Sequence, residues 1–167
     1  IKSQIILYKK VFKKKSIAID SHEHVHMIPW IFSIIIELSQ KYNISEIRIP
    51  KENFFLCKTT DIFNINYLLN LLKLLIINFF WTFCKPNIKK IKIINFTGLV
   101  YSGIQNQNSI ASGMKQYFKN KTNIEVLLHP GHTNITEKKK FKNKYYKYYS
   151  SINRIREYKL MISKNIF

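Results

Sequence analysis

The sequence predicts an α/β fold whose functional residues lie at the carboxyl ends of parallel strands. Three observations predict it: helical and strand-like stretches alternate along the chain, prolines separate several of them, and all five histidines fall in two loops that directly follow predicted strands. Alternating strands and helices are typical of βαβ units, whose parallel sheet is either doubly wound or closed as a barrel. In both architectures the active site is built from loops at the carboxyl ends of the strands.

The first half of the chain alternates twice between helix and strand. Residues 2–14 have apolar side chains at helical spacing, and residues 16–20 form a short apolar run that predicts a buried strand. A helix over residues 30–41 begins directly after Pro29, because a proline suits a first helical turn. The run EIRI at residues 46–49 predicts the second strand.

The second half continues this alternation. A helix is predicted over residues 65–83, and its apolar core from residue 67 falls short of the roughly 20 residues that a membrane span needs. We therefore expect this helix to be buried against a sheet on more than one face. Further elements are predicted at residues 90–96 and 123–128 (strands) and at residues 108–119 and 151–162 (helices).

Composition limits the class of protein. The 167 residues are 46% hydrophobic, which is enough for one core, and we expect residues 1–167 to form a single domain. The net charge of +19 comes from lysines spread over every segment of a chain rich in Ile, Asn, Tyr and Phe, which indicates compositional bias rather than a polyanion site. Cys57 and Cys84 lack CxxC spacing, so free thiols in a reducing cytoplasm are expected.

The first histidine loop reads Asp20-Ser-His22-Glu-His24-Val-His26. If this segment is extended, alternate side chains place Asp20 and all three histidines on one face. Imidazoles at this spacing, joined by a carboxylate, suit a divalent metal ion. The alternative is a solvated loop whose histidines only cap and hydrogen-bond.

The second histidine loop is His129-Pro-Gly-His132, which follows the strand predicted at residues 123–128. Histidine is the usual general acid or base because its ordinary pKa lies near neutrality. A core histidine bonded to the backbone is the alternative for His129. Arg48, at the end of the second strand, is predicted to contact substrate or a neighbouring carboxylate, and a solvated arginine is the alternative.

Five segments carry a resemblance to a known family. They are DSHEHVHMIP at residues 20–29, IRIPKE at residues 47–52, GLVYSG at residues 98–103, EVLLHPG at residues 125–131, and Arg154, Glu157, Leu160 and Ser163 of the closing helix. In order and spacing they resemble the YdjC/ChbG-like carbohydrate deacetylases. The resemblance implies a distorted (β/α) barrel of the glycoside hydrolase/deacetylase type. It also implies a metal-dependent hydrolase that removes acetyl groups from N-acetylated amino sugars or oligosaccharides.

Site roles follow from this resemblance and from the histidine loops. By the resemblance His22 is a metal ligand, and His129 is the acid that protonates the leaving amine. We expect Asp20 to bind the metal with His22 or to support it from behind. His24 and His26 are expected to line the substrate pocket, with His26, nearest Pro29, mainly structural.

The expected cofactor is a divalent metal ion, Mg²⁺ or Zn²⁺. A histidine-rich shell with carboxylates is compatible with zinc, whereas completion by oxygen ligands suits magnesium. The expected partner is an acetylated amino sugar or oligosaccharide. Arg48, His24 and His26 are the residues expected to bind this substrate. We expect neither nucleic acid nor a membrane as a partner, and a homodimer is left open.

The sequence departs from the family in one respect. The paired-aspartate strand with which family members begin, and the next strand with its metal-binding histidine, have no counterpart before Asp20. We therefore expect the N-terminal strands of the barrel to be missing and the chain alone to be catalytically silent. The alternatives are an inactive remnant that binds carbohydrate or a partner chain, and a nucleic-acid-binding protein that uses the Lys/Tyr run at residues 141–149.

Overall fold

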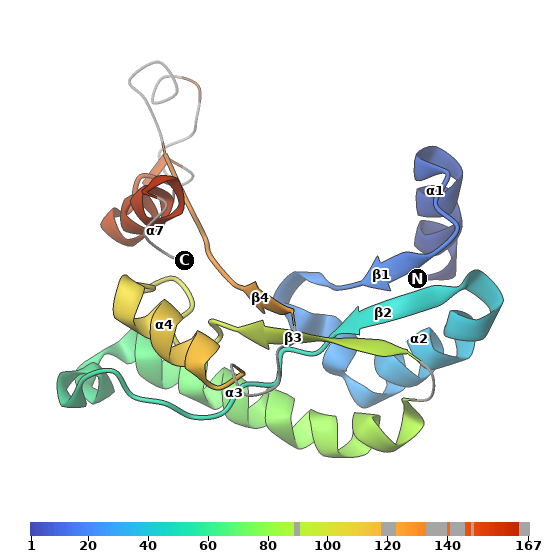
Figure 1. Ribbon diagram of the computed structural model, residues 1–167, viewed down its shortest axis with the longest axis horizontal. Helices are drawn as coiled ribbons and strands as arrows, with labels where there is room; N and C mark the ends of the chain where they lie inside the picture. Colours follow the sequence, from blue (N-terminus) through green and yellow to red (C-terminus); the bar gives the residue numbers. More distant parts are fainter. Residues whose placement is uncertain (89–90, 118–122, 133–139, 141–145, 148, 164–167) are drawn as a thin grey trace. The chain divides into compact units, whose positions relative to one another are not determined.

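The computed structural model describes residues 1–88, 91–117, 123–132, 140, 146–147 and 149–163 (Figure 1). In chain order the elements are α1 (Lys2–Phe12), β1 (Ile17–Ile19), η1 (His22–Met27), α2 (Pro29–Tyr42), β2 (Ile44–Arg48), η2 (Thr59–Phe63), α3 (Ile65–Cys84), η3 (Lys85–Asn87), β3 (Lys92–Thr97), α4 (Gln107–Lys115), β4 (Ile124–Val126) and α7 (Ile152–Ile162). The predicted alternation of helices and strands is confirmed. Residues 90, 118 and 119 of the predicted elements, and most of the Lys/Tyr run, lie outside the described residues.

The strands form a sheet in the order β1-β2-β3-β4. β1, β2 and β3 pair in parallel, with Ile19 opposite Ile47 and Ile47 opposite Ile93. Because each of these strands is joined to the next by a helix, their carboxyl ends lie at one edge of the sheet. The α/β class with a parallel sheet is therefore confirmed.

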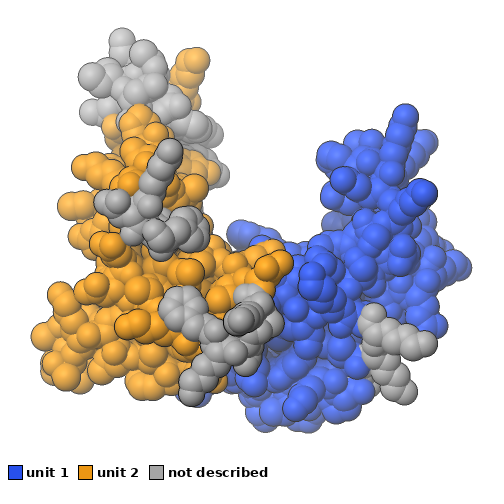
Figure 2. All heavy atoms as spheres, in the orientation of Figure 1, with its two compact units in different colours: residues 1–51, 75–96 blue, residues 52–74, 97–167 orange. Residues whose placement is uncertain are grey.

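The chain divides into two compact units (Figure 2). The first unit comprises residues 1–51 and 75–96, and the second unit comprises residues 52–74 and 97–167. α3 contributes to both units, and β3 crosses from the first to the second at its last residue. The prediction of a single domain stays a prediction.

The core of the first unit lies between the sheet and α2. Ile44 and Ile47 of β2 are at most 4% exposed, as are Phe32 and Ile35 on the inner face of α2. Pro29 occupies the first turn of α2, and the helix ends at Asn43, whose backbone is left-handed with φ 51°. Asparagine tolerates this conformation better than most residues, so the chain reverses there and enters β2 directly.

α3 is predominantly apolar, but only one face is buried. The buried positions recur every three or four residues: Tyr67, Asn70, Leu74, Ile77, Trp81 and Cys84. On the opposite face Leu72, Leu75 and Phe79 are 55%, 60% and 60% exposed. The prediction of burial on more than one face is therefore wrong. Among the described residues α3 is long and apolar enough to cross a membrane by length and composition alone, and 28% of its apolar window is buried.

Candidate functional site

The first histidine loop does not continue as an extended strand. β1 ends at Ile19, and residues His22–Met27 form η1, a short 3-10 helix. Within it Glu23 and His24 have left-handed backbone, with φ 50° and 60°. Side chains alternate between two faces only along an extended chain. The prediction that Asp20 and the three histidines share one face is therefore wrong.

His26 is held by hydrogen bonds on both sides of its ring. Its side chain is 1% exposed. Nε2 lies 2.7 Å from the carbonyl oxygen of Arg48, and Nδ1 lies 2.7 Å from the hydroxyl oxygen of Ser21. A carbonyl only accepts, so Nε2 carries the hydrogen and Nδ1 accepts from Ser21. With both nitrogens occupied in this way, the ring ties η1 to the end of β2 and is not placed to bind a metal ion.

Replacing His26 with glutamine is expected to lower the free energy of unfolding by about 1–3 kcal/mol, because one buried partner loses its hydrogen bond. Burial is the main effect and lowers the pKa of His26, and the positive charge of Arg48 lowers it further. The hydrogen bond to the Arg48 backbone and the negative charge of Asp20 act in the opposite direction. A folded pKa below the unfolded value gives stability that is present above about pH 6.5 and is lost as the pH falls through the folded pKa.

Urea unfolding between pH 5 and pH 8 tests both effects. The free energy of unfolding of the wild type should decrease as the pH is lowered, and that of His26→Gln should decrease less steeply. His132→Gln, which changes an exposed histidine, is the matched control and should follow the wild type. If His26→Gln loses stability towards acid as steeply as the wild type, another group causes the pH dependence.

Asp20 and Arg48 form an ion pair at the carboxyl ends of β1 and β2. Oδ2 of Asp20 accepts a hydrogen bond from Nη1 of Arg48. The guanidinium also lies 5.7 Å from the centre of the Phe96 ring on β3. The ring of His24 packs edge-on against the same Phe96, with 5.4 Å between the ring centres. The first unit thus brings Asp20, His24, His26 and Arg48 together at the strand ends.

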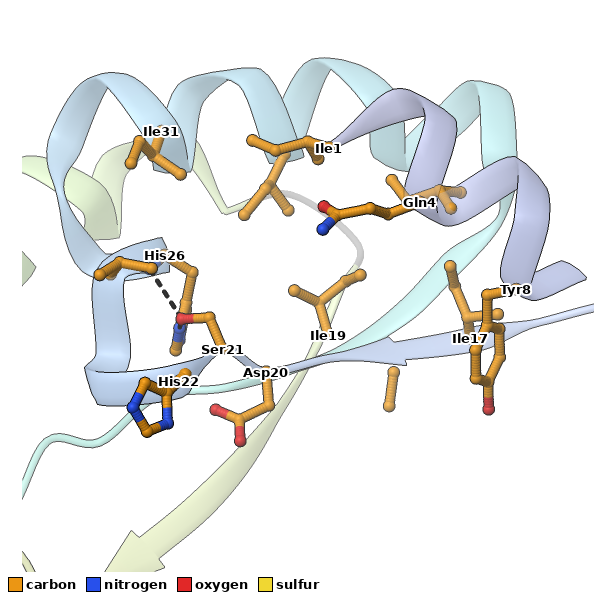
Figure 3. Close-up of a pocket in the computed structure, with 14 residues that line it drawn as sticks. Ile1, Gln4, Tyr8, Ile17, Ile19, Asp20, Ser21, His22, His26 and Ile31 are labelled. Carbon is orange, nitrogen blue, oxygen red and sulfur yellow. Dashed lines mark hydrogen bonds between the residues drawn. The ribbon is translucent and has the colours of Figure 1, made fainter. Parts of the chain in front are cut away.

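His22 is exposed and helps to line a cavity of about 520 Å³ in the first unit (Figure 3). Asp20, Ser21 and His26 also line it, together with apolar side chains of α1, β1 and α2. An imidazole and a carboxylate are donors that suit a divalent cation. Within the described part of the chain, however, no three His, Cys, Asp or Glu side chains are placed to hold one metal ion. His22 and Asp20 are therefore suitable types of metal ligand, but the described residues do not supply enough such ligands for a complete metal site.

His129 follows β4 in the second unit, and α7 holds its backbone from both sides. The His129 amide donates to Oε2 of Glu157, and its carbonyl accepts from Nη1 of Arg154 at 3.4 Å. The amide of Gly131 donates to the carbonyl of Arg154 at 3.1 Å. A Cβ at position 131 would lie 2.4 Å from the carbonyl oxygen of Tyr149, so only glycine allows this close approach.

The imidazole of His129 is less constrained than its backbone. The ring is half-buried, and within the described residues its buried Nδ1 makes no hydrogen bond. Burial lowers the pKa of His129, and the positive charges of Arg154 and Lys73 lower it further. All three effects disfavour the imidazolium ion, so the resting ring is neutral near pH 7.

Two buried glutamates of the second unit were not predicted as site residues. Glu52 is 1% exposed and accepts hydrogen bonds from the Thr97 hydroxyl, from the Gly98 amide at 2.8 Å and from the Val100 amide at 3.0 Å. α4 packs closely on this cluster, since a Cβ on Gly113 would lie 2.1 Å from the Thr97 hydroxyl oxygen. Glu52 ends the IRIPKE run, and its place in that family-like segment was the available signal.

Glu157 is the second of these glutamates and is 0% exposed. Besides the amide of His129 it accepts the amide of Gln105 at 3.2 Å. Nε2 of Gln105 in turn donates to the carbonyl of Gly98 at 3.0 Å. Glu157 therefore joins the loop after β3 to the loop after β4. Its sequence signal was its place among the closing-helix residues that resemble the family.

The fold defines an α/β protein with a parallel sheet, and each of its two units has imidazole side chains in a loop that follows a strand. A sequence model of the family described as YdjC-like protein matches residues 1–167. The chain therefore belongs to the YdjC-like family, as predicted from its motifs. No curated protein and no solved structure matches it.

Proposed function

We propose that the chain belongs to a carbohydrate deacetylase that removes acetyl groups from N-acetylated amino sugars or oligosaccharides. Its family is related in general to carbohydrate deacetylases, and the match extends over the whole chain. The observation that carries the proposal is the state of His129: its backbone is fixed by α7, and its ring has a buried Nδ1 without a hydrogen bond in the described residues. We further propose that the sheet is part of a distorted barrel.

In this proposal His129 is the general acid. Hydrolysis of an acetamide adds water to the carbonyl carbon and then breaks the C–N bond, which releases acetate and an amine. The amine nitrogen needs a proton as that bond breaks, and an imidazolium can deliver it. Because the resting ring of His129 is neutral, it takes up a proton from solvent before the reaction and donates that proton to the leaving amine, so the imidazolium is the active form.

The ion pair of Asp20 and Arg48 is proposed to organise the substrate side of the site. Arg48 holds the Asp20 carboxylate in one orientation, and a guanidinium group is a hydrogen-bond donor that suits hydroxyl and carbonyl oxygens of a sugar. His24 is proposed to contact substrate beside Arg48, against the Phe96 ring. His26 keeps η1 in place behind them.

We propose that His22 and Asp20 supply two ligands of a divalent metal ion, Mg²⁺ or Zn²⁺. When bound, such an ion polarises the amide carbonyl and lowers the pKa of its water. The remaining ligands are proposed to come from outside the described residues, because these do not complete a metal site by themselves.

Replacing His22 with alanine is expected to weaken binding of the metal ion at least tenfold, the lower end of what lost metal-site contacts cost. Isothermal titration with Zn²⁺ and, separately, with Mg²⁺ measures this without any need for turnover. His132→Ala removes one exposed imidazole from the second unit and should leave the affinity unchanged. Equal affinities for His22→Ala and the wild type would contradict the ligand assignment.

The function is tested by acetate release from a chitooligosaccharide. The 167-residue chain and the complete product of its natural gene are compared, each with its His129→Ala variant. Acetate release that depends on His129 supports the deacetylase. A second candidate is a noncatalytic protein that binds carbohydrate. It is favoured because the described residues alone do not supply a complete set of metal ligands. Oligosaccharide binding without acetate release from either protein would support that candidate.

A further inference from the structure

Glu157 combines complete burial with an unusual set of partners. It lies on α7 with 0% exposure, and both of its oxygens accept from backbone amides: Oε2 from His129 and Oε1 from Gln105. Burial raises the pKa of Glu157, while the two amides and the charge of Arg154 oppose that rise. A buried carboxylate is costly, so its hydrogen bonds indicate what it stabilises. Here they stabilise the positions of two loop backbones.

The hydrogen bonds around His129 constrain the backbone more than the ring. Its amide is bonded to Glu157 and its carbonyl to Arg154, both on α7. Its Nδ1 has no hydrogen bond within the described residues, so no described partner orients the imidazole from that side. In many histidine sites a carboxylate bonded to the ring performs this task. In this protein the nearby carboxylate bonds the peptide instead.

We infer that Glu157 is a positioning residue that sets the orientation of the His129 ring through its backbone amide. The inference rests on the role proposed for His129. A carboxylate suits this task because two N–H groups converge on it and it has acceptors only. A glutamine of the same shape has one oxygen and one NH₂ group, so one of the two amides would face another donor. Positioning errors of about 1 Å can lower catalytic rates about 10²-fold.

The same carboxylate also fixes His129 relative to the loop that follows β3. Gln105, the second partner of Glu157, donates through Nε2 to the carbonyl of Gly98 and accepts through Oε1 from the Ser109 hydroxyl at 2.5 Å. Gly98 is in turn bonded to Glu52 through its amide. A chain of hydrogen bonds thus connects the loop after β3, α4, α7 and the loop after β4, and Glu157 is its contact with His129.

The test compares Glu157→Gln with Lys159→Gln, a matched change of an exposed charge on the same helix. The probe is the natural gene product labelled with ¹⁵N, observed by NMR at the His129 amide and at the carbon-bound protons of its ring. In Glu157→Gln the amide proton should move upfield as its charged acceptor is lost, and the ring signals should shift with it. With a chitooligosaccharide as substrate, kcat should fall about 10–100-fold with KM within about twofold.

A merely structural role would lower the unfolding midpoint of Glu157→Gln and leave its kcat unchanged at temperatures where the variant is folded. That result, or unchanged His129 signals, would overturn the inference. If Glu157→Gln does not fold, Glu157→Asp keeps the charge but shortens the reach, and full kcat in that variant would also overturn it. If the wild type releases no acetate, the deacetylase proposal fails, while the His129 amide and ring signals still decide whether Glu157 positions the residue.

Discussion

Replacing His129 with alanine is expected to lower the rate of acetamide hydrolysis by about 10²–10⁴-fold, the usual contribution of a general acid. The physical reason is the leaving group: an amine departs only when its nitrogen is protonated, and the variant has no imidazolium to supply that proton. The proposed task of His129 is proton transfer to the leaving amine, and within the described residues its buried Nδ1 makes no hydrogen bond, so the loss should appear in kcat more than in KM. Initial rates of acetate release measure both parameters.

The pH dependence gives an independent check on the same residue. Activity that needs the imidazolium falls as the pH rises through the pKa of His129, which burial, Arg154 and Lys73 lower from its ordinary value. Replacing the exposed Lys73 with glutamine removes one of the positive charges that lower the pKa of His129. The pKa should therefore rise, and the alkaline limb of the pH–rate profile, where activity falls, should move to higher pH. His132→Ala should leave the limb in place. A limb that stays where it is in Lys73→Gln, or that persists in His129→Ala, would assign the titration to another group.

Replacing Glu52 with alanine is expected to lower the free energy of unfolding by on the order of 3 kcal/mol or more, because three donors lose a buried charged acceptor together. These donors are the Thr97 hydroxyl and the amides of Gly98 and Val100. Glu52→Gln should be intermediate, since its single oxygen can satisfy only part of the set. Urea unfolding at pH 7 measures the differences.

The matched control is Glu37→Ala, which removes an exposed glutamate from α2. A surface change of this kind is expected to stay within about 0.5 kcal/mol of the wild type. Equal stabilities of Glu52→Ala and Glu37→Ala would show that the buried carboxylate contributes nothing net. In that case the donors of residues 97–100 find other partners, such as water.

Local pattern was sufficient to predict most of the elements. α2 was predicted from helical periodicity behind Pro29, and the structure begins that helix at the proline itself. η1 could not be predicted in this way, because its shape depends on His26 bonding to Ser21 and to the Arg48 carbonyl, 22 residues away. On α3 large apolar residues occur on all sides of the helix, so the periodicity of the sequence could not distinguish the buried face from the exposed one.

The site was predicted only in part, because some of its contacts join residues that are far apart in the sequence. Histidines after strands are visible as a sequence pattern, and they led to His22, His24, His26 and His129. The buried glutamates are not visible in that way, because their partners are backbone amides far along the chain. Gly98 lies 46 residues from Glu52, and His129 lies 28 residues from Glu157. Only the folded chain shows that these carboxylates hold the loops.

Gly113, in the last turn of α4, restricts how relatives of this chain can diverge. A Cβ at position 113 would lie 2.1 Å from the Thr97 hydroxyl oxygen, which is the group bonded to Glu52. A larger residue at 113 therefore requires the hydroxyl at 97 to be lost, and Glu52 then loses one of its donors. We expect positions 52, 97 and 113 to change together among related sequences. A homologue with alanine at 113 should carry a residue without a hydroxyl at 97.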